Sequence, residues 1–130
     1  MKYIVLGGVA AGTKTAAKLK REDINNEVTI YTKEKEISYA GCGLPYYIGG
    51  AIEERESLVV NTPEKYSSLT GVEVKTEMEA VSVDKDKKVV SFKNGDSVSY
   101  DRLIIATGAS PIKPEVDGIK LDGVFTLRSV

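Results

Sequence analysis

The stretch Lys2-Tyr-Ile-Val-Leu-Gly-Gly-Val-Ala-Ala-Gly12 decides the fold of this chain. Its first part, Lys2 to Leu6, is an apolar run with the length of a buried parallel strand. The glycine-rich segment Gly7 to Gly12 follows, and a helix is predicted from there through about Arg21. A turn leads to a second strand at Val28 to Tyr31, which completes a βαβ unit of about 30 residues.

The glycine-rich segment has the form of a phosphate-binding turn. Glycines between a strand and a helix let the backbone approach a pyrophosphate, and the helix N-terminus supplies N–H groups and partial positive charge. In the spacing Gly-x-Gly-x-x-Gly, Gly7 and Gly12 fill the first and third places, whereas Val9 stands at the second. A generic tight turn is the alternative, but the position directly after a strand favours phosphate binding.

The acidic residue that usually accompanies this turn is absent. It is expected about 20 residues further on, at the end of the second strand, where it binds the adenosine ribose. Thr32 stands at that place and cannot supply a carboxylate. Glu34 and Glu36 follow within a charged turn, which is interpreted as a solvated loop. The ribose contact is therefore either a threonine hydroxyl or missing.

The rest of the chain predicts short elements. Thr62-Pro63 favours a helix that runs to about Leu69. Residues 79–100 are predicted to form an antiparallel three-stranded meander, in which Asn94-Gly95 is a hairpin signal because both residues tolerate positive φ. Arg102 to Ala106 then returns as a buried strand. The predicted fold class is α/β, with a parallel sheet, helices and this meander.

Composition excludes several classes of function. The 130 residues, 42% of them hydrophobic, suffice for one domain. Eighteen basic and 19 acidic side chains give a net charge of -1, which indicates no nucleic-acid or anionic-membrane partner. No stretch approaches the roughly 20 apolar residues of a membrane span. The absence of histidine excludes Ser-His-Asp hydrolysis and most zinc sites, and no metal site is predicted.

The single cysteine, Cys42, lies in an unusual setting. One cysteine cannot form an internal disulfide and suits a reducing cytoplasm. A lone cysteine is most often an inert buried residue. Here Gly41 and Gly43 leave the sulfur accessible, and Ser38 is a plausible cap for a helix that begins near Cys42. That placement would favour the reactive thiolate. The tyrosines nearby would flank a cofactor or pack in the core.

Three motifs carry a family resemblance. Gly7 to Gly12, Ser38 to Gly49 and Tyr100 to Ala109 resemble the coenzyme A-disulfide reductase and NADH oxidase group of the FAD-dependent pyridine nucleotide-disulfide oxidoreductases. The resemblance implies a Rossmann-like FAD-binding domain, of which residues 1–130 are expected to be the N-terminal portion. The nicotinamide-binding and dimerisation domains are then expected to be absent, the parent protein to be a homodimer, and this portion alone to be inactive.

The resemblance also implies roles for residues. Electrons would pass from NAD(P)H through FAD to Cys42, and from there to a disulfide, persulfide, peroxide or oxygen. The implied FAD contacts are Gly7, Gly8, Val9, Ala10, Ala11 and Gly12 at the pyrophosphate, Thr32 and Lys33 at the ribose, Val81 at the adenine, and Ala106, Thr107 and Gly108 at the flavin.

The substrate stays open at this stage. In the coenzyme A-disulfide reductases, polar and basic side chains hold the coenzyme, and Gly41 and Thr70 stand at two of the matching places. Candidate substrate contacts that remain are Lys14, Lys18, Arg21 and Ser38, although the lysines also fit a solvated helix face. Two alternatives from other classes are a non-catalytic dinucleotide-binding module with a structural cysteine and a thiol redox sensor without flavin.

Overall fold

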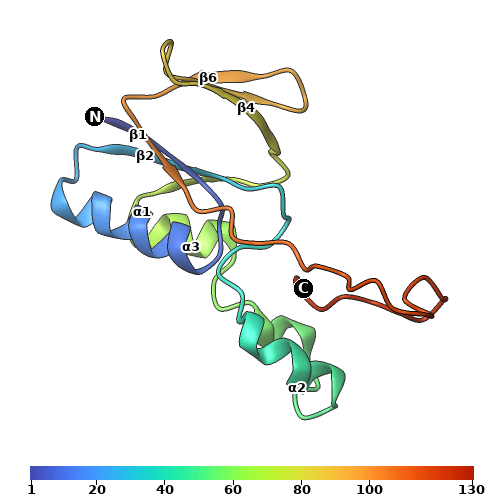
Figure 1. Ribbon diagram of the computed structural model, residues 1–130. Helices are drawn as coiled ribbons and strands as arrows, with labels where there is room; N and C mark the ends of the chain where they lie inside the picture. The colour runs from blue at the N-terminus through green and yellow to red at the C-terminus, as the bar shows by residue number, and fades with distance from the viewer.

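The computed structural model describes all 130 residues and is built around a parallel four-stranded sheet. The strand order is β3 (Glu73–Lys75), β2 (Glu27–Tyr31), β1 (Lys2–Leu6) and β7 (Arg102–Ile105). All three pairings are parallel, with β1 between β2 and β7. Figure 1 shows these strands running side by side through the centre of the molecule.

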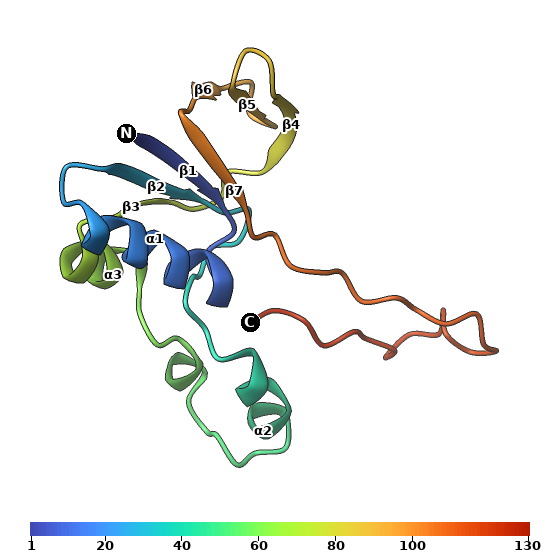
Figure 2. The same cartoon turned by 60° about the vertical axis from the view of Figure 1, so that its left-hand side comes forward.

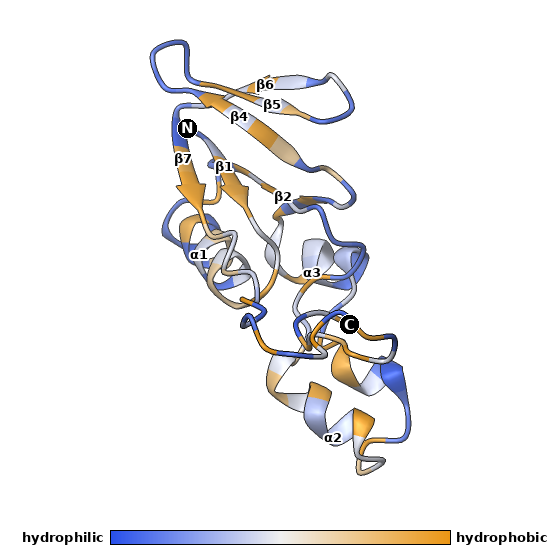
Figure 3. Ribbon diagram, turned by 45° about the vertical axis from the view of Figure 1, so that its right-hand side comes forward, coloured by the Kyte–Doolittle hydropathy of each residue, from blue (hydrophilic) through white to orange (hydrophobic).

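One face of the sheet is covered by helices and the other by the meander. Helices α1 (Ala10–Glu22) and α3 (Pro63–Thr70) lie together on one face (Figure 2). Successive residues of a strand point to opposite faces, so Val5 packs toward the helices, whereas Ile4 and Leu6 pack toward the meander. The helix-side core consists of Val5, Ala16, Val28, Ile30, Ile37, Tyr66 and Val72. Figure 3 shows β1 as a hydrophobic strand between the two layers.

The meander has the predicted order. Strands β4 (Ala80–Asp84), β5 (Val89–Phe92) and β6 (Ser97–Ser99) pair antiparallel in sequence order. Of the two residues of its hairpin signal, Asn94 and Gly95, only Gly95 adopts positive φ, at 92°. The Gly95 N–H donates to Phe92 O at 3.0 Å, and the Phe92 N–H donates to Asp96 O at 2.9 Å. This is a longer hairpin loop with glycine at the left-handed position.

Helix α3 begins at the capping threonine and proline that the sequence predicts. The Thr62 hydroxyl accepts the Lys65 N–H at 3.3 Å, as an N-cap does, and Pro63 occupies the first turn. Gly71 ends the helix with φ of 72°. The Tyr66 hydroxyl, buried beneath the helix, donates to the carbonyl of Thr13 and so ties α3 to α1.

Residues 38–60 form a separate excursion that carries Cys42. A 3-10 turn at Gly41–Gly43 runs into α2 (Leu44–Ile48), and a second 3-10 turn spans Arg55–Leu58. Two hydrogen bonds close its base, from the Ala40 N–H to Leu58 O at 2.7 Å and from the Val60 N–H to Ser38 O at 3.0 Å. Figure 1 shows α2 projecting away from the sheet.

The strand at Arg102 to Ala106 was predicted to be buried, and this prediction is wrong. As β7 it forms the edge of the sheet, so one side of its backbone has no neighbouring strand, and Ile105 is 67% exposed. Residues 107–130 leave the sheet without further helix or strand and double back (Figure 2). No helix in the structure has the length and apolar character needed to cross a membrane.

Candidate functional site

The glycine turn lies where β1 ends and α1 begins. A side chain at Gly7, whose φ is 111°, would overlap the carbonyl oxygen of Ala106, the residue directly after β7. A side chain at Gly12 would overlap the carbonyl oxygen of Gly7. These two glycines therefore let α1 approach β1, and let β1 approach the segment after β7, more closely than any other residue allows.

Gly8 has a role that the Gly-x-Gly-x-x-Gly spacing does not predict. A Cβ at this buried position would lie 2.7 Å from Cγ2 of Ile37. The carbonyl of Gly8 also accepts the N–H of Ser38 at 2.8 Å. Gly8 thus joins the turn to the start of the excursion that carries Cys42.

The first turn of α1 has the electrostatics of an anion site. Val9 is the N-cap and provides no side-chain hydrogen bond, and the first turn contains no acidic residue. Lys20 and Arg21 lie in the last turn, where positive charge complements the helix dipole. The N–H groups of Ala10 and Ala11, in the exposed first turn, are therefore available to an anionic group.

Thr32 directly follows β2 and is used by the fold itself. Its side chain is buried, and its hydroxyl accepts the N–H of Glu34 at 3.3 Å. Its backbone N–H donates to Lys75 O at 3.0 Å, and its carbonyl accepts the Met78 N–H at 2.8 Å. Lys33, the next residue, is exposed. The ribose contact proposed for Thr32 stays a prediction. Its hydroxyl is buried and already accepts the Glu34 N–H.

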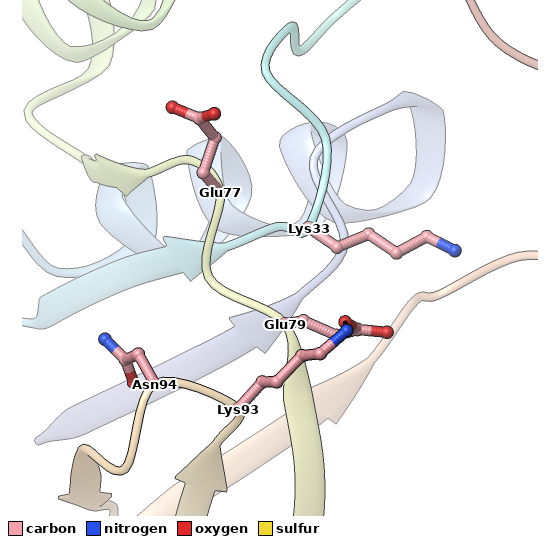
Figure 4. Close-up of a pocket in the computed structure, with 5 residues that line it drawn as sticks. All are labelled: Lys33, Glu77, Glu79, Lys93 and Asn94. Atoms are coloured by element: carbon pink, nitrogen blue, oxygen red, sulfur yellow. Dashed lines mark hydrogen bonds and ion pairs between the residues drawn. The ribbon is translucent and has the colours of Figure 1, made fainter.

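A pocket of about 330 Å³ opens beside Lys33. It lies between the end of β2 and the meander, and the other residues that line it are Glu77, Glu79, Lys93 and Asn94. The carboxylate of Glu79 pairs with the ammonium of Lys93 at 3.0 Å. Figure 4 shows Lys33, Glu79 and Lys93 extending to one side of the pocket, whereas Glu77 and Asn94 extend away from them. Sequence reasoning missed this pocket because its residues come from segments whose contact depends on the tertiary fold.

Val81 lies at an irregularity of β4. The register shifts between Ala80 and Ser82, so Val81 has no residue opposite it on β5. Its side chain is 59% exposed. A bulge of this kind leaves the backbone groups of the extra residue outside the ladder. The predicted adenine contact through the Val81 backbone is compatible with this geometry and stays a prediction.

The segment Ala106-Thr107-Gly108 lies beside the glycine turn. The Ala106 N–H donates to Leu6 O at 2.8 Å, which continues the pairing of β1 and β7. Gly108 has φ of 71°, and a Cβ there would lie 2.6 Å from Nη2 of Arg128. The structure thus brings together the first and third of the three motifs, which are about 100 residues apart in the sequence.

Cys42 is exposed and is the middle residue of the 3-10 turn Gly41–Gly43, so a helical segment begins near it, as expected. The prediction that Ser38 caps this helix is wrong. Ser38 adopts φ of 51°, the N-cap positions are Ala40 and Gly43, and neither helix has a side-chain cap. The Ser38 hydroxyl instead accepts a hydrogen bond from the side-chain amide nitrogen of Asn61 at 3.4 Å.

The tyrosines around Cys42 divide between the two interpretations left open. Tyr39 is buried, and its burial, with Glu34 nearby, raises the pKa of its hydroxyl. Tyr46 and Tyr47 are exposed on α2, with Tyr46 at 62%. Tyr39 therefore packs into the fold, whereas the other two are exposed on the helix that follows Cys42.

The basic residues of α1 are solvent-facing. Lys18 pairs with Glu22 one turn away, and this contact lowers the pKa of the Glu22 carboxyl. Lys14 and Arg21 are exposed and form no ion pair. The pairing of Lys18 favours the solvated-face interpretation for that residue. Substrate contacts by Lys14 and Arg21 remain predictions.

The family model described as pyridine nucleotide-disulphide oxidoreductase matches residues 1–130. The chain belongs to this family. Among its relatives, an NADH oxidase of Methanocaldococcus jannaschii is 38% identical over 100% of this chain and 30% of its own length. A coenzyme A disulfide reductase of Staphylococcus haemolyticus is 34% identical over 99% of this chain and 30% of its own length.

Solved structures in the family share the fold. The reduced Bacillus anthracis protein CoADR-RHD superposes with a TM-score of 0.91 at 40% identity, over 99% of this chain and 24% of that chain. An NAD-dependent persulfide reductase from A. fulgidus gives a TM-score of 0.92 at 38% identity, over 99% of this chain and 26% of that chain. The predicted resemblance and the α/β fold with its antiparallel meander are confirmed. The chain spans about 30% of the length of the curated relatives it matches.

Proposed function

We propose that this chain binds FAD across the carboxyl ends of β1, β2 and β7, and that Cys42 exchanges electrons with a small-molecule acceptor. The geometry of the glycine turn is the main support for this proposal. Gly7 and Gly12 allow close backbone approach, and the uncapped first turn of α1 presents N–H groups with no acidic side chain to compete. These residues fit the pyrophosphate of a dinucleotide, which needs both features.

When bound, FAD would accept reducing equivalents from NAD(P)H and pass them on. The chain's own residues would do the positioning. Gly7, Gly12 and the first turn of α1 would hold the pyrophosphate, and Ala106 to Gly108 would lie along the flavin. The relatives named for NADH oxidation, coenzyme A disulfide and persulfide support a cofactor of this kind.

The exposed thiol of Cys42 supports its redox role over a structural one. A structural cysteine contributes by packing, and an exposed side chain packs little. With a disulfide as acceptor, the thiolate would attack one sulfur, form a mixed disulfide and release one thiol. Two electrons from NAD(P)H would then restore Cys42 and release the second thiol. A persulfide, peroxide or oxygen would serve as the alternative acceptor. A cytoplasmic location and a homodimeric parent stay predictions.

The matched variants Val9→Asp and Val9→Asn test the cofactor site. Both place a side chain of similar size at the N-cap of α1, but only aspartate adds a negative charge beside the expected pyrophosphate. Titration of FAD by flavin fluorescence should show binding to the native chain. Both variants should bind more weakly, because either side-chain oxygen can accept from the N–H groups of the first turn. Binding to Val9→Asp should be weaker than binding to Val9→Asn by about tenfold or more, equivalent to about 1.4 kcal/mol. Equal affinities of the two variants, or no binding to the native chain, would refute the site.

The thiol is tested with a small-molecule disulfide and mass spectrometry. The folded native chain should form a mixed disulfide at Cys42, and Cys42→Ser should form none. If the chain reacts only after unfolding in urea, Cys42 has a structural role and the redox proposal fails.

A further inference from the structure

The family's ribose-binding position, at the end of the second strand, lacks its carboxylate in this chain. Thr32 occupies the place, but its side chain is only 5% exposed and its hydroxyl accepts the Glu34 N–H at 3.3 Å. A hydroxyl oxygen can accept two hydrogen bonds, but a ribose hydroxyl can reach it only where it is exposed. The buried hydroxyl of Thr32 does not meet this condition.

The tertiary fold brings another carboxylate to the same place. The Met78 N–H donates to the carbonyl of Thr32 at 2.8 Å, and the Glu77 N–H donates to the carbonyl of Glu34 at 3.3 Å. The segment that leads into β4 therefore runs directly along the end of β2. Glu79 is the residue after Met78 and lines the pocket together with Lys33.

The side chain of Glu79 points to the side of the sheet where a dinucleotide binds. Figure 4 shows Lys33, Glu79 and Lys93 extending toward the end at which the parallel strands terminate, while Glu77 extends in another direction. In open α/β sheets, ligands bind outside the carboxyl ends of the strands. Glu79 is thus the acidic residue of this pocket that faces the cofactor side.

Lys93 orients the Glu79 carboxylate and contacts only one of its two oxygens. Its ammonium contacts Oε2 of Glu79 at 3.0 Å, and its backbone N–H donates to the Glu79 carbonyl at 2.9 Å. Oε1 has no partner in the protein and remains free to accept a hydrogen bond. Of the two acidic residues that follow Thr32 in the sequence, Glu36 is committed to Arg55 at 2.8 Å, and the carboxylate of Glu34 lies near Tyr39.

We propose that Glu79 supplies the carboxylate that binds the ribose hydroxyls of the adenosine half of FAD, in place of an acidic residue at position 32. The inference rests on the proposed function, since it assumes that the dinucleotide lies across this edge of the sheet. It identifies a binding residue on the meander, where the family pattern places one on the parallel sheet.

The test compares Glu79→Gln with the control Glu77→Gln, because both residues line the pocket and only Glu79 faces the cofactor side. Both are surface changes, and loss of an exposed ion pair such as Glu79–Lys93 costs little stability, so both variants should fold. FAD, ADP and 2′,3′-dideoxy-ADP are titrated by calorimetry. Glu79→Gln should weaken FAD and ADP by about 10- to 100-fold, the range of a hydrogen bond to a charged group. Glu77→Gln should leave both unchanged.

The dideoxy nucleotide shows whether the lost contact is the ribose contact. It should bind the native chain and Glu79→Gln equally, because it has no hydroxyl for the carboxylate to bind. Native affinity of Glu79→Gln for ADP, or an equal loss in Glu77→Gln, overturns the inference but leaves FAD binding intact. A native chain that binds neither FAD nor ADP overturns the proposed function, and this inference with it.

Discussion

Replacing Gly12 with alanine sets two physical effects of opposite sign against each other. Gly12 is the third residue of α1, and alanine is favoured over glycine inside a helix by about 0.8 to 1.0 kcal/mol. Propensity alone therefore predicts a more stable protein. The structure predicts the reverse, because the new methyl group would overlap the backbone carbonyl of Gly7 and would lie 3.3 Å from Cγ1 of Val5.

The steric effect should dominate. The overlapping atom at Gly7 belongs to the backbone, which cannot rotate away as a side chain can, so α1 has to move off β1. Overpacking of this kind costs typically about 1 to 3 kcal/mol, and a backbone overlap belongs at the upper end. After the gain in propensity, the net loss should be about 1 to 2 kcal/mol. At an m-value of about 2 kcal/mol/M, the urea midpoint would fall by about 0.5 to 1 M.

Urea unfolding followed by circular dichroism measures this difference, with Thr15→Ala as the control. Thr15 lies one turn later in α1, half-buried and with no side-chain hydrogen bond, so its replacement should follow propensity and raise the midpoint slightly. A Gly12→Ala variant that is as stable as the native chain, or more so, would refute the close approach of α1 to β1. The proposed pyrophosphate cradle would then lose its structural basis.

Two further predictions concern stability. A hydrogen bond from Lys75, with another from Thr29, lowers the pKa of Glu73, so its contribution is present above the unfolded-state pKa and is lost as pH falls through the folded-state pKa. The ordinary pKa of a glutamate side chain is about 4.3. Glu73→Gln should therefore lose less stability than the native chain between pH 6 and pH 3 in urea titrations. Equal losses of stability in the two proteins would contradict this. Tyr66→Phe removes the bond to the Thr13 carbonyl and should cost about 0.5 to 1.5 kcal/mol, whereas an unchanged urea midpoint would mean that the bond contributes nothing.

The regular elements of this fold are predictable because their signals are local. The apolar run at Lys2 to Leu6, the capping pair Thr62-Pro63 and the hairpin signal at Asn94-Gly95 each act within a few residues, and each lies where it was expected. The exposure of β7 was not predictable in this way. Its composition is that of a buried strand, but its exposure follows from its place at the edge of the sheet.

The ribose end of the site shows why site residues are harder to predict than elements. The sequence shows that Thr32 lacks a carboxylate, but it does not show which other acidic residue comes near. Glu34 and Glu36 are close in sequence, whereas Glu79 is brought there by the backbone hydrogen bond between Met78 and Thr32. That bond depends on the packing of the meander on the sheet, which no local pattern encodes.

The two glycines that flank Cys42 are equivalent in sequence and different in structure. A Cβ at Gly43 would lie 2.7 Å from Cδ2 of Leu58, so a larger residue there would have to displace this buried side chain at the base of the excursion. A Cβ at Gly41 would meet no atom within 4 Å, so packing places no demand on that position. The absence of a side chain at Gly41 therefore leaves open space next to an exposed thiol, while Gly43 fixes the turn that presents it. Access to Cys42 and the fold around Cys42 thus depend on different residues.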